Sequence, residues 1–287
     1  MTSSTPAAPD PALLTTRSAR VREARKLSRR SVRTERRLFV VDGPKGLEAA
    51  LETPGRVREV FVTPAAAERY GALLTTLART APAVPVHRVD GPAMEALSDA
   101  VTPAGVVAVC TPLDVPLAEL LAPGPRLVAL CADVRDPGNA GTVVRCADAA
   151  GADGVALLGN AVDLHNPKTV RASVGSVFHL PIAVETDVAG AVAAVRAAGL
   201  RVLAADGGGR LDLFEAEASG LLAEPTAWLL GNEAWGLPGE VAALADDVVS
   251  IPIHGRAESL NLATAAALCL YASARAQRAA GAAAPRP

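Results

Sequence analysis

Residues 228–238 read WLLGNEAWGLP, in which a short apolar stretch is followed directly by a glycine-rich polar turn. Similar apolar stretches recur through the second half of the chain, and helical patterns separate most of them. Continuous aliphatic strands that alternate with helices are typical of a mostly parallel sheet covered on both faces. We therefore predict an α/β domain with strands at Leu127–Cys131, Val155–Leu158, Leu180–Val184, Val202–Ala205, Trp228–Leu230 and Val248–Ile251.

Three polar or glycine-rich segments, 133–145, 231–238 and 252–261, come just after predicted strands. Ligands in such sheets bind beyond the carboxyl ends of the strands. The three segments are therefore predicted to form one site. Each also has an ordinary structural explanation, because Asn139 and Asn261 are placed to cap helices.

The chain is predicted to have four parts. Residues 1–37 are expected to form a flexible basic arm, with disorder over 1–16 and a helix over 17–37. A small α/β unit is expected over 38–110. A proline-rich linker over 111–125, with one helical turn at most, would precede the larger domain at 126–287.

The charge of the chain is unevenly distributed. The formal net charge is only −2, yet residues 17–37 hold ten basic and two acidic side chains. A basic segment on an otherwise acidic protein favours a polyanionic partner over a merely solvated helix. A nucleic-acid contact is therefore predicted at Arg29, Arg30, Arg33, Arg36 and Arg37.

The sequence lacks the motifs of several other classes of protein. No GxGxxG follows a strand and there is no GxxxxGK[ST], which argues against a dinucleotide-binding and a P-loop protein, and there is no GxSxG nucleophile elbow. The four cysteines show no CxxC spacing, so no metal is predicted and buried free thiols are expected. The N-terminus does not read as a signal peptide and no apolar run is long enough to span a bilayer, so a cytoplasmic protein is expected.

Taken in order, three motifs resemble those of the SpoU/TrmH family of RNA ribose 2′-O-methyltransferases, in the SPOUT superfamily. The matching pieces are DPGN at 136–139 with Arg145, GNEAWGL at 231–237, and IPI at 251–253 with ESLN at 258–261. The segment FVVDG at 39–43 resembles the L30e-like substrate-binding domain often attached to this family. Ala234 and Asp42 depart from the family pattern, where Gly and Glu are usual.

The resemblance implies a catalytic domain with a C-terminal trefoil knot that binds S-adenosylmethionine. It also implies a homodimer whose active site is completed across the subunit interface. The residues implied in catalysis are Asn139, Arg145, Glu233, Ser259 and Asn261. Those implied in cofactor binding are Gly231, Asn232, Ile251, Ile253 and Leu260.

Methyl transfer from a sulfonium to a ribose hydroxyl needs no protein nucleophile. Catalysis therefore consists of aligning the two reactants and accommodating the proton of the hydroxyl. The family's usual proposal makes Arg145 the general base. A guanidinium stays protonated in proteins, so a positioning and charge-stabilising role is the less demanding hypothesis. The two-domain layout resembles the branch that modifies 23S ribosomal RNA, which includes antibiotic-resistance enzymes. A tRNA methyltransferase, a non-catalytic ribosome-binding factor and a Rossmann-type oxidoreductase are the alternatives.

Overall fold

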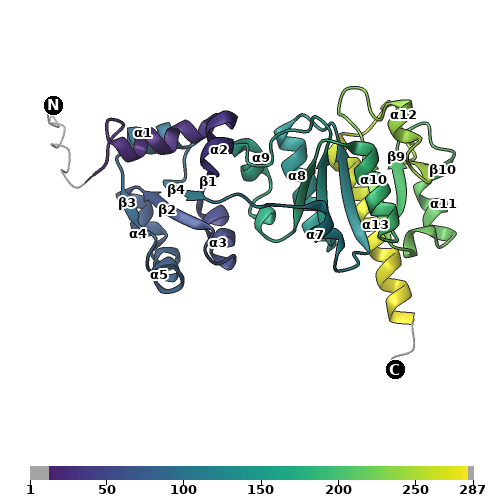
Figure 1. Cartoon of the computed structure of the whole chain (residues 1–287), viewed down its shortest axis with the longest axis horizontal. Helices are drawn as coiled ribbons and strands as arrows, with labels where there is room; N and C mark the ends of the chain where they lie inside the picture. The colour runs from purple at the N-terminus through teal and green to yellow at the C-terminus, as the bar shows by residue number, and fades with distance from the viewer. Residues whose placement is uncertain (1–12, 284–287) are drawn as a thin grey trace. The chain divides into compact units, whose positions relative to one another are not determined.

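The protein is an α/β structure built from two compact units, which divide between Pro112 and Leu113. The structure is a computed structural model, and it describes residues 13–283 (Figure 1). Each unit has its own sheet, with four strands in the first and eight in the second. None of the described helices combines the length and apolarity that crossing a bilayer requires.

The first unit is centred on a fully buried strand, β4. The sheet order is β1-β4-β2-β3; β1 and β2 run antiparallel to β4, and β3 runs parallel to β2. The strands are β1 Phe39–Asp42, β2 Val57–Val62, β3 Val86–Arg88 and β4 Val106–Cys110. The helices are α1 Ala19–Arg25, η1 Lys26–Ser28, α2 Arg30–Arg36, α3 Pro44–Glu52, α4 Pro64–Arg69, α5 Gly71–Thr80 and α6 Gly91–Leu97.

The structure differs from the predicted flexible arm over residues 14–36. Val21, Ala24 and Leu27 are three residues apart, so they lie on one side of α1 and η1, where they are buried in the core of the first unit. Leu14 also forms a β-bridge with Val89. This apolar stripe lies among arginines, and its burial anchors the basic segment to the domain. Residues 1–12 of the predicted arm lie outside the described residues.

The second unit contains the predicted parallel sheet. Its order is β10-β12-β9-β11-β6-β7-β8-β5, and every recorded strand pair is parallel. The strands are β5 Asp114–Val115, β6 Leu127–Ala132, β7 Gly154–Leu158, β8 Ile182–Glu185, β9 Arg201–Ala205, β10 Leu211–Asp212, β11 Thr226–Leu230 and β12 Asp247–Ser250. The six strands predicted from the sequence are present with small shifts, and β5 and β10 are two-residue edge strands that were not predicted.

Helices cover both faces of this sheet. The helices are α7 Leu117–Leu121, α8 Pro137–Ala150, α9 Pro167–Ala172, η2 Ser176–Phe178, α10 Val188–Ala197, α11 Leu213–Ala218, η3 Leu221–Ala223, α12 Gly239–Ala242 and α13 Leu262–Ala283. One face packs against α7, α10 and the segment around α12. The long helix α13, yellow in Figure 1, packs against α8, β6 and β11.

Much of the predicted linker belongs to the second unit. Leu117, Leu120 and Leu121 of α7 are buried in its core, and β5 pairs with β8. The spacing of these leucines places all three on one side of a short helix, where they cover apolar surface of the sheet. Pro116 lies directly after β5 and is the N-cap residue of α7, so this proline borders ordered elements and does not mark a loose linker.

The strand register aligns the ends of four neighbouring strands. Leu230 of β11 is paired with Cys131 of β6 on one side and with Ala205 of β9 on the other, and Ala205 is also paired with Val249 of β12. The residues that follow these strands therefore emerge at the same edge of the sheet. The strand order reverses between β6 and β11, and such a switch point is where open α/β sheets bind ligands.

All four cysteines are free thiols, and three of them are buried. Burial raises the pKa of Cys131 to about 12, with the charge of Glu233 adding to the effect, and burial also raises the pKa of Cys269 to about 12 and that of Cys110. Only a thiolate is an effective nucleophile. We expect iodoacetamide at pH 8 to leave these three unmodified in the native protein and to modify them in guanidinium chloride, measured by peptide mass spectrometry. Rapid native labelling of Cys131 would contradict this packing.

Candidate active site

The loops after β6 and β11 are joined by the side chain of Glu233. One carboxylate oxygen accepts the backbone N–H of Asp136 at 3.1 Å, and the other accepts that of Arg135 at 3.3 Å. A carboxylate that accepts two backbone N–H groups fixes both the loop that carries it and the loop that donates. Glu233 therefore holds together two of the three predicted segments.

A tight turn begins directly after β11. The backbone N–H and C=O of Asn232 both bond to Gly236, while the Asn232 side chain donates to the Asp133 carbonyl at 2.7 Å and accepts from the Ala234 N–H at 2.8 Å. Gly231 is required by this turn, because a Cβ there would lie 2.5 Å from the Gly236 carbonyl oxygen and 2.6 Å from the Leu237 nitrogen. The turn is thus closed on itself and tied to the β6 loop.

The third segment reaches the first through Asn261. Its side-chain oxygen accepts the N–H of Ala263 at 2.9 Å, which caps α13 as predicted, and its amide donates to the Asn139 side-chain oxygen at 3.0 Å. This contact joins residues 122 positions apart. All three segments predicted to form one site are therefore connected by hydrogen bonds.

The prediction that Asn139 caps α8 is wrong, because Asp136 is the N-cap. The Asp136 carboxylate accepts the backbone N–H of Asn139 at 2.8 Å, and Pro137 occupies the first turn of the helix. Partial burial raises the pKa of Asp136, but hydrogen bonds from Asn139 and Lys168 outweigh it and bring the pKa below its ordinary value. Since Asp136 caps the helix, the Asn139 side chain is available to Asn261.

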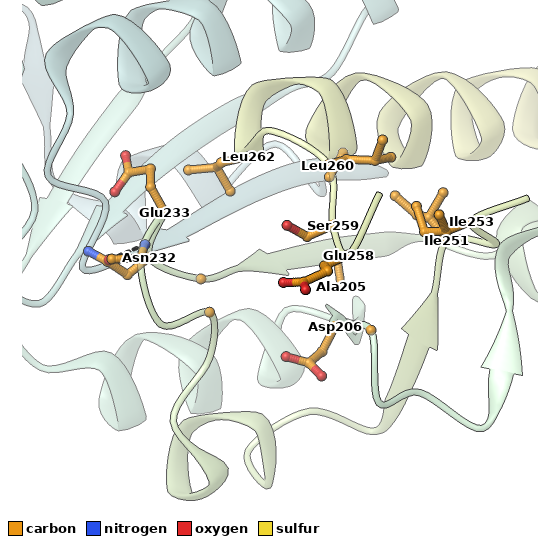
Figure 2. Close-up of a pocket in the computed structure, with 15 residues that line it drawn as sticks. Ala205, Asp206, Asn232, Glu233, Ile251, Ile253, Glu258, Ser259, Leu260 and Leu262 are labelled. Carbon is orange, nitrogen blue, oxygen red and sulfur yellow. Dashed lines mark hydrogen bonds between the residues drawn. The ribbon is translucent and has the colours of Figure 1, made fainter. Parts of the chain in front are cut away.

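A cavity of about 320 Å³ lies at the carboxyl edge of the sheet (Figure 2). In Figure 2, Asp206, Glu258 and Ser259 lie in the centre, with Ile251 and Ile253 on one side and Asn232 and Glu233 on the other. The cavity lining comes from the ends of β9, β11 and β12 and from the start of α13. Its lining residues are Ala205, Asp206, Gly207, Gly231, Asn232, Glu233, Ala234, Gly236, Ile251, Ile253, Glu258, Ser259, Leu260, Leu262 and Ala265.

Most of the predicted site residues lie in the wall of this cavity. All five residues implied in cofactor binding line it, as do Glu233 and Ser259. Asn139, Arg145 and Asn261 do not line it. The side chain of Arg145 is exposed on α8 and has no hydrogen bond or ion pair to another residue in the range 13–283, so it is available to a partner or substrate.

Sequence reasoning missed several residues of the cavity wall. Asp206 and Gly207 follow β9 directly, and the glycine loop 207–209 matches no phosphate-binding motif. The available signal was the position of Asp206 after an apolar strand, at the same edge as Gly231 and Ile251. Glu258, Leu262 and Ala265 also line the cavity. Within residues 13–283, no group of three or more His, Cys, Asp or Glu side chains is arranged to hold a metal ion.

The basic segment of the first unit contains arginines in different environments. Arg33, predicted to contact nucleic acid, is buried, and its guanidinium donates to the carbonyls of Leu27 and Ser28, both at 2.8 Å. This prediction is therefore corrected, since those contacts fix the end of η1. Arg36 is exposed and paired with Glu23 at 2.5 Å. Arg29, Arg30 and Arg37 are exposed.

Arg33→Ala is expected to destabilise the first unit by about 2 kcal/mol, because two carbonyls lose a charged donor. Arg30→Ala is the matched control, since the Arg30 side chain is exposed. Thermal melting should show a lower Tm for Arg33→Ala and an unchanged Tm for Arg30→Ala. Equal Tm values for the two variants would show that the buried hydrogen bonds do not stabilise the unit.

The site and the sheet together define an α/β protein with a cavity of about 320 Å³ at the switch point of a parallel sheet. Residues 126–271 match the model of the SpoU rRNA Methylase family, and residues 18–108 match that of the MRM3-like substrate binding domain. The chain belongs to the SpoU rRNA methylase family.

Similar proteins cover most of the chain. The 23S rRNA (guanosine(2553)-2′-O)-methyltransferase RlmP of Bacillus subtilis is 31% identical over 89% of this chain and 96% of its own length. A 23S rRNA (uridine(2479)-2′-O)-methyltransferase of Streptomyces viridochromogenes is 42% identical over 53% of each chain. The crystal structure of AviRb from Streptomyces viridochromogenes in complex with AdoMet is 32% identical, covers 92% of this chain and 100% of that one, and has a TM-score of 0.77.

Proposed function

We propose that this protein transfers a methyl group from S-adenosylmethionine to a ribose 2′-hydroxyl of RNA, and that its substrate is 23S ribosomal RNA. The observation that carries the proposal is the cavity at the carboxyl edge, whose wall includes residues of two motif loops. Glu233 of one of these loops and Asn261 of the other are hydrogen-bonded to the remaining motif segment, 133–145. The AdoMet-bound relative of the same fold supports the choice of cofactor.

The wall of the cavity fits this cofactor chemically. Ile251, Ile253 and Leu260 offer apolar surface of the kind that encloses an adenosyl group. Asp206 and Glu258 place carboxylates at the same cavity, where they complement the positive charge of a sulfonium and an amino group. Bound there, S-adenosylmethionine would supply an activated methyl group, so the chain itself need not provide a nucleophile.

The residues of this chain would then orient the incoming sugar. Arg145 positions the 2′-hydroxyl or an adjacent phosphate and stabilises the negative charge that develops on the attacking oxygen. Asn139 accepts a hydrogen bond from Asn261 and so holds the beginning of α8 next to the third loop. The contacts of Glu233 with two backbone N–H groups support a loop-positioning role. Ser259 faces the cavity, where it would shape the cofactor pocket.

The predicted trefoil knot is part of the proposal. β12 lies beside β9, whereas β11 lies on the other side of β9, so the connection from β11 to β12 passes β9, and its residues around α12 pack against one face of the sheet. The chain then returns from β12 to place Asn261 next to Asn139, which follows β6. The chain thus passes β9 after β11 and returns toward β6 after β12, and this doubling back supports a knotted connection.

We also propose a homodimer whose active site is completed across the subunit interface. Arg145 is absent from the cavity wall of its own chain, so a second chain could supply it. Leu268 and Tyr271 of α13 are exposed by 43% and 52%, respectively, and they are three residues apart, so they offer an apolar surface for that contact. Light scattering after gel filtration would measure the mass in solution.

The first unit would bind the RNA outside the reaction centre. Arg29, Arg30, Arg36 and Arg37 are exposed on α2 or at its ends, where they can contact phosphates in any sequence. RlmP and the Streptomyces relative are named for a guanosine and a uridine of 23S rRNA, respectively, which supports 23S rRNA as substrate without fixing the base. A cytoplasmic location is expected from that substrate, and a role in antibiotic resistance stays a prediction.

The direct test is to map ribose methylation across ribosomal RNA in cells with and without this protein. We expect one 23S position to lose its 2′-O-methyl group when the gene is deleted, and purified protein with S-adenosylmethionine to restore it. Methylation of purified tRNA alone would support the tRNA alternative. Absence of S-adenosylmethionine binding by calorimetry would support the non-catalytic one. Growth on ribosome-targeting antibiotics, compared between the two strains, tests the resistance role.

A further inference from the structure

The two tryptophans of the chain have opposite environments. Trp228 is fully buried in β11, and its indole N–H donates to the Ser273 hydroxyl at 2.9 Å. Trp235 lies in the turn after the same strand and is 53% exposed. A single exposed apolar side chain is common and needs no explanation. Trp235 is unusual because a second exposed side chain lies against its ring.

That second side chain is Arg135, whose guanidinium carbon lies 5.2 Å from the centroid of the Trp235 ring. Arg135 is itself exposed and follows β6, so the pair joins two loops about 100 residues apart. Glu233 holds the Arg135 backbone N–H, and Asn232 holds the Asp133 carbonyl at 2.7 Å, so both backbones are fixed near the ring. The aromatic surface is therefore preorganised by the turn and does not depend on a mobile loop.

The pair lies at the rim of the cavity. Ala234 and Gly236, the chain neighbours of Trp235, both line the cavity, whereas Trp235 does not. A sugar presented at this rim to a methyl group in the cavity would place its base beside the pair. An indole can stack with a flat nucleobase, and a neighbouring guanidinium adds a cation for the phosphate or the ring.

We propose that Trp235 and Arg135 form a stacking platform for the base of the nucleotide whose ribose is methylated. This inference rests on the proposed function and adds a substrate contact to it. Stacking uses the face of the base and not its edge, so the platform accepts purines and pyrimidines alike and orients the nucleotide without reading its identity. The platform therefore affects the binding of RNA and the alignment of the nucleotide, and it does not contact the cofactor.

The buried position of Trp228 makes the platform directly observable. Acrylamide quenching of tryptophan fluorescence should report on Trp235, since Trp228 is inaccessible. We expect a 23S rRNA fragment spanning the mapped methylation position to lower the fluorescence and to protect it from acrylamide. In Trp235→Phe most of the RNA affinity should remain, whereas in Trp235→Ala it should fall about 10- to 100-fold. The KM for RNA should rise by a similar factor, with a smaller change in kcat.

Phe214→Ala is the matched control, because Phe214 is an aromatic residue of the same unit, is 58% exposed and is absent from the cavity wall. This variant should bind RNA as the unaltered protein does. Calorimetry with S-adenosylmethionine separates the two proposals. If the unaltered protein does not bind S-adenosylmethionine, the proposed function is rejected. Normal methylation with the same KM in Trp235→Ala would reject the platform alone. A change of oligomeric state in Trp235→Ala at unchanged RNA affinity would also reject it, because the indole would then belong to a subunit contact.

Discussion

Arg145→Ala is expected to lower kcat for RNA methylation by about 10²- to 10³-fold, the usual cost of removing one charge-stabilising donor. The affinity for S-adenosylmethionine should stay unchanged, because Arg145 does not line the cavity. The Arg145 side chain is exposed on α8 and makes no hydrogen bond or ion pair within the described part of the chain, so its loss should leave the Tm unchanged. Single-turnover methylation and calorimetry measure the two quantities separately.

Arg145→Lys distinguishes two accounts of this residue. Lysine keeps a positive charge but lacks the planar, bidentate donor geometry of a guanidinium. We expect the Lys variant to remain strongly impaired if Arg145 aligns the hydroxyl or a phosphate through two hydrogen bonds. Turnover close to that of the unaltered protein would show that a positive charge at this point is sufficient.

Gly231→Ala is expected to have the largest effect on the cavity itself. The added Cβ would lie 2.5 Å from the Gly236 carbonyl oxygen and 2.6 Å from the Leu237 nitrogen, both of which are backbone atoms of the turn. Relieving that overlap requires the turn to open, which should cost about 1–3 kcal/mol of stability. S-adenosylmethionine binding should be lost as well, since the turn forms part of the cavity wall.

Gly239→Ala provides the control for Gly231→Ala. Gly239 begins α12, and a Cβ there would meet no atom within 4 Å. Its Tm and cofactor affinity should match those of the unaltered protein. If Gly231→Ala bound S-adenosylmethionine equally well in calorimetry, the close approach of the two backbone segments would be unimportant for the site.

The two variants together test the proposed interface. Arg145→Ala keeps the cavity, and Gly231→Ala keeps the arginine. If each active site combines one chain's cavity with the other chain's Arg145, mixed dimers contain one complete site. Activity should therefore appear when the two inactive variants are unfolded together and refolded. No recovery, with mixed dimers present by mass, would place Arg145 at the cavity of its own chain.

The parallel sheet was accessible from the sequence because strands buried on both faces must be continuously apolar. Each strand from β6 to β9, together with β11 and β12, carries such a stretch. The edge at which the three motif segments meet was also accessible, since loops after parallel strands share one edge of the sheet. Short elements were less visible: α7 was interpreted as part of a linker because its prolines were given more weight than its leucines.

The amphipathic character of the basic segment was likewise underestimated. Val21, Ala24 and Leu27 are buried apolar positions among many arginines, and their burial depends on the partner surface that the sheet and α6 provide. The same applies to Arg33, which cannot be distinguished by sequence from its exposed neighbours. Its two carbonyl acceptors come from the turn at η1, whose geometry the charge pattern does not describe.

Local patterns of apolar and polar residues were therefore enough to predict the sheet, the covering helices and the edge at which the motif loops lie. The reason is that a buried strand or helix face requires apolar residues at regular positions in the sequence. The pairing of Glu233 with the β6 loop, of Asn261 with Asn139 and of Arg135 with Trp235 was decided only by folding. These partners are about 100 residues apart, and their contacts depend on the order of the strands in the sheet. The local pattern of apolar and polar residues does not specify that order.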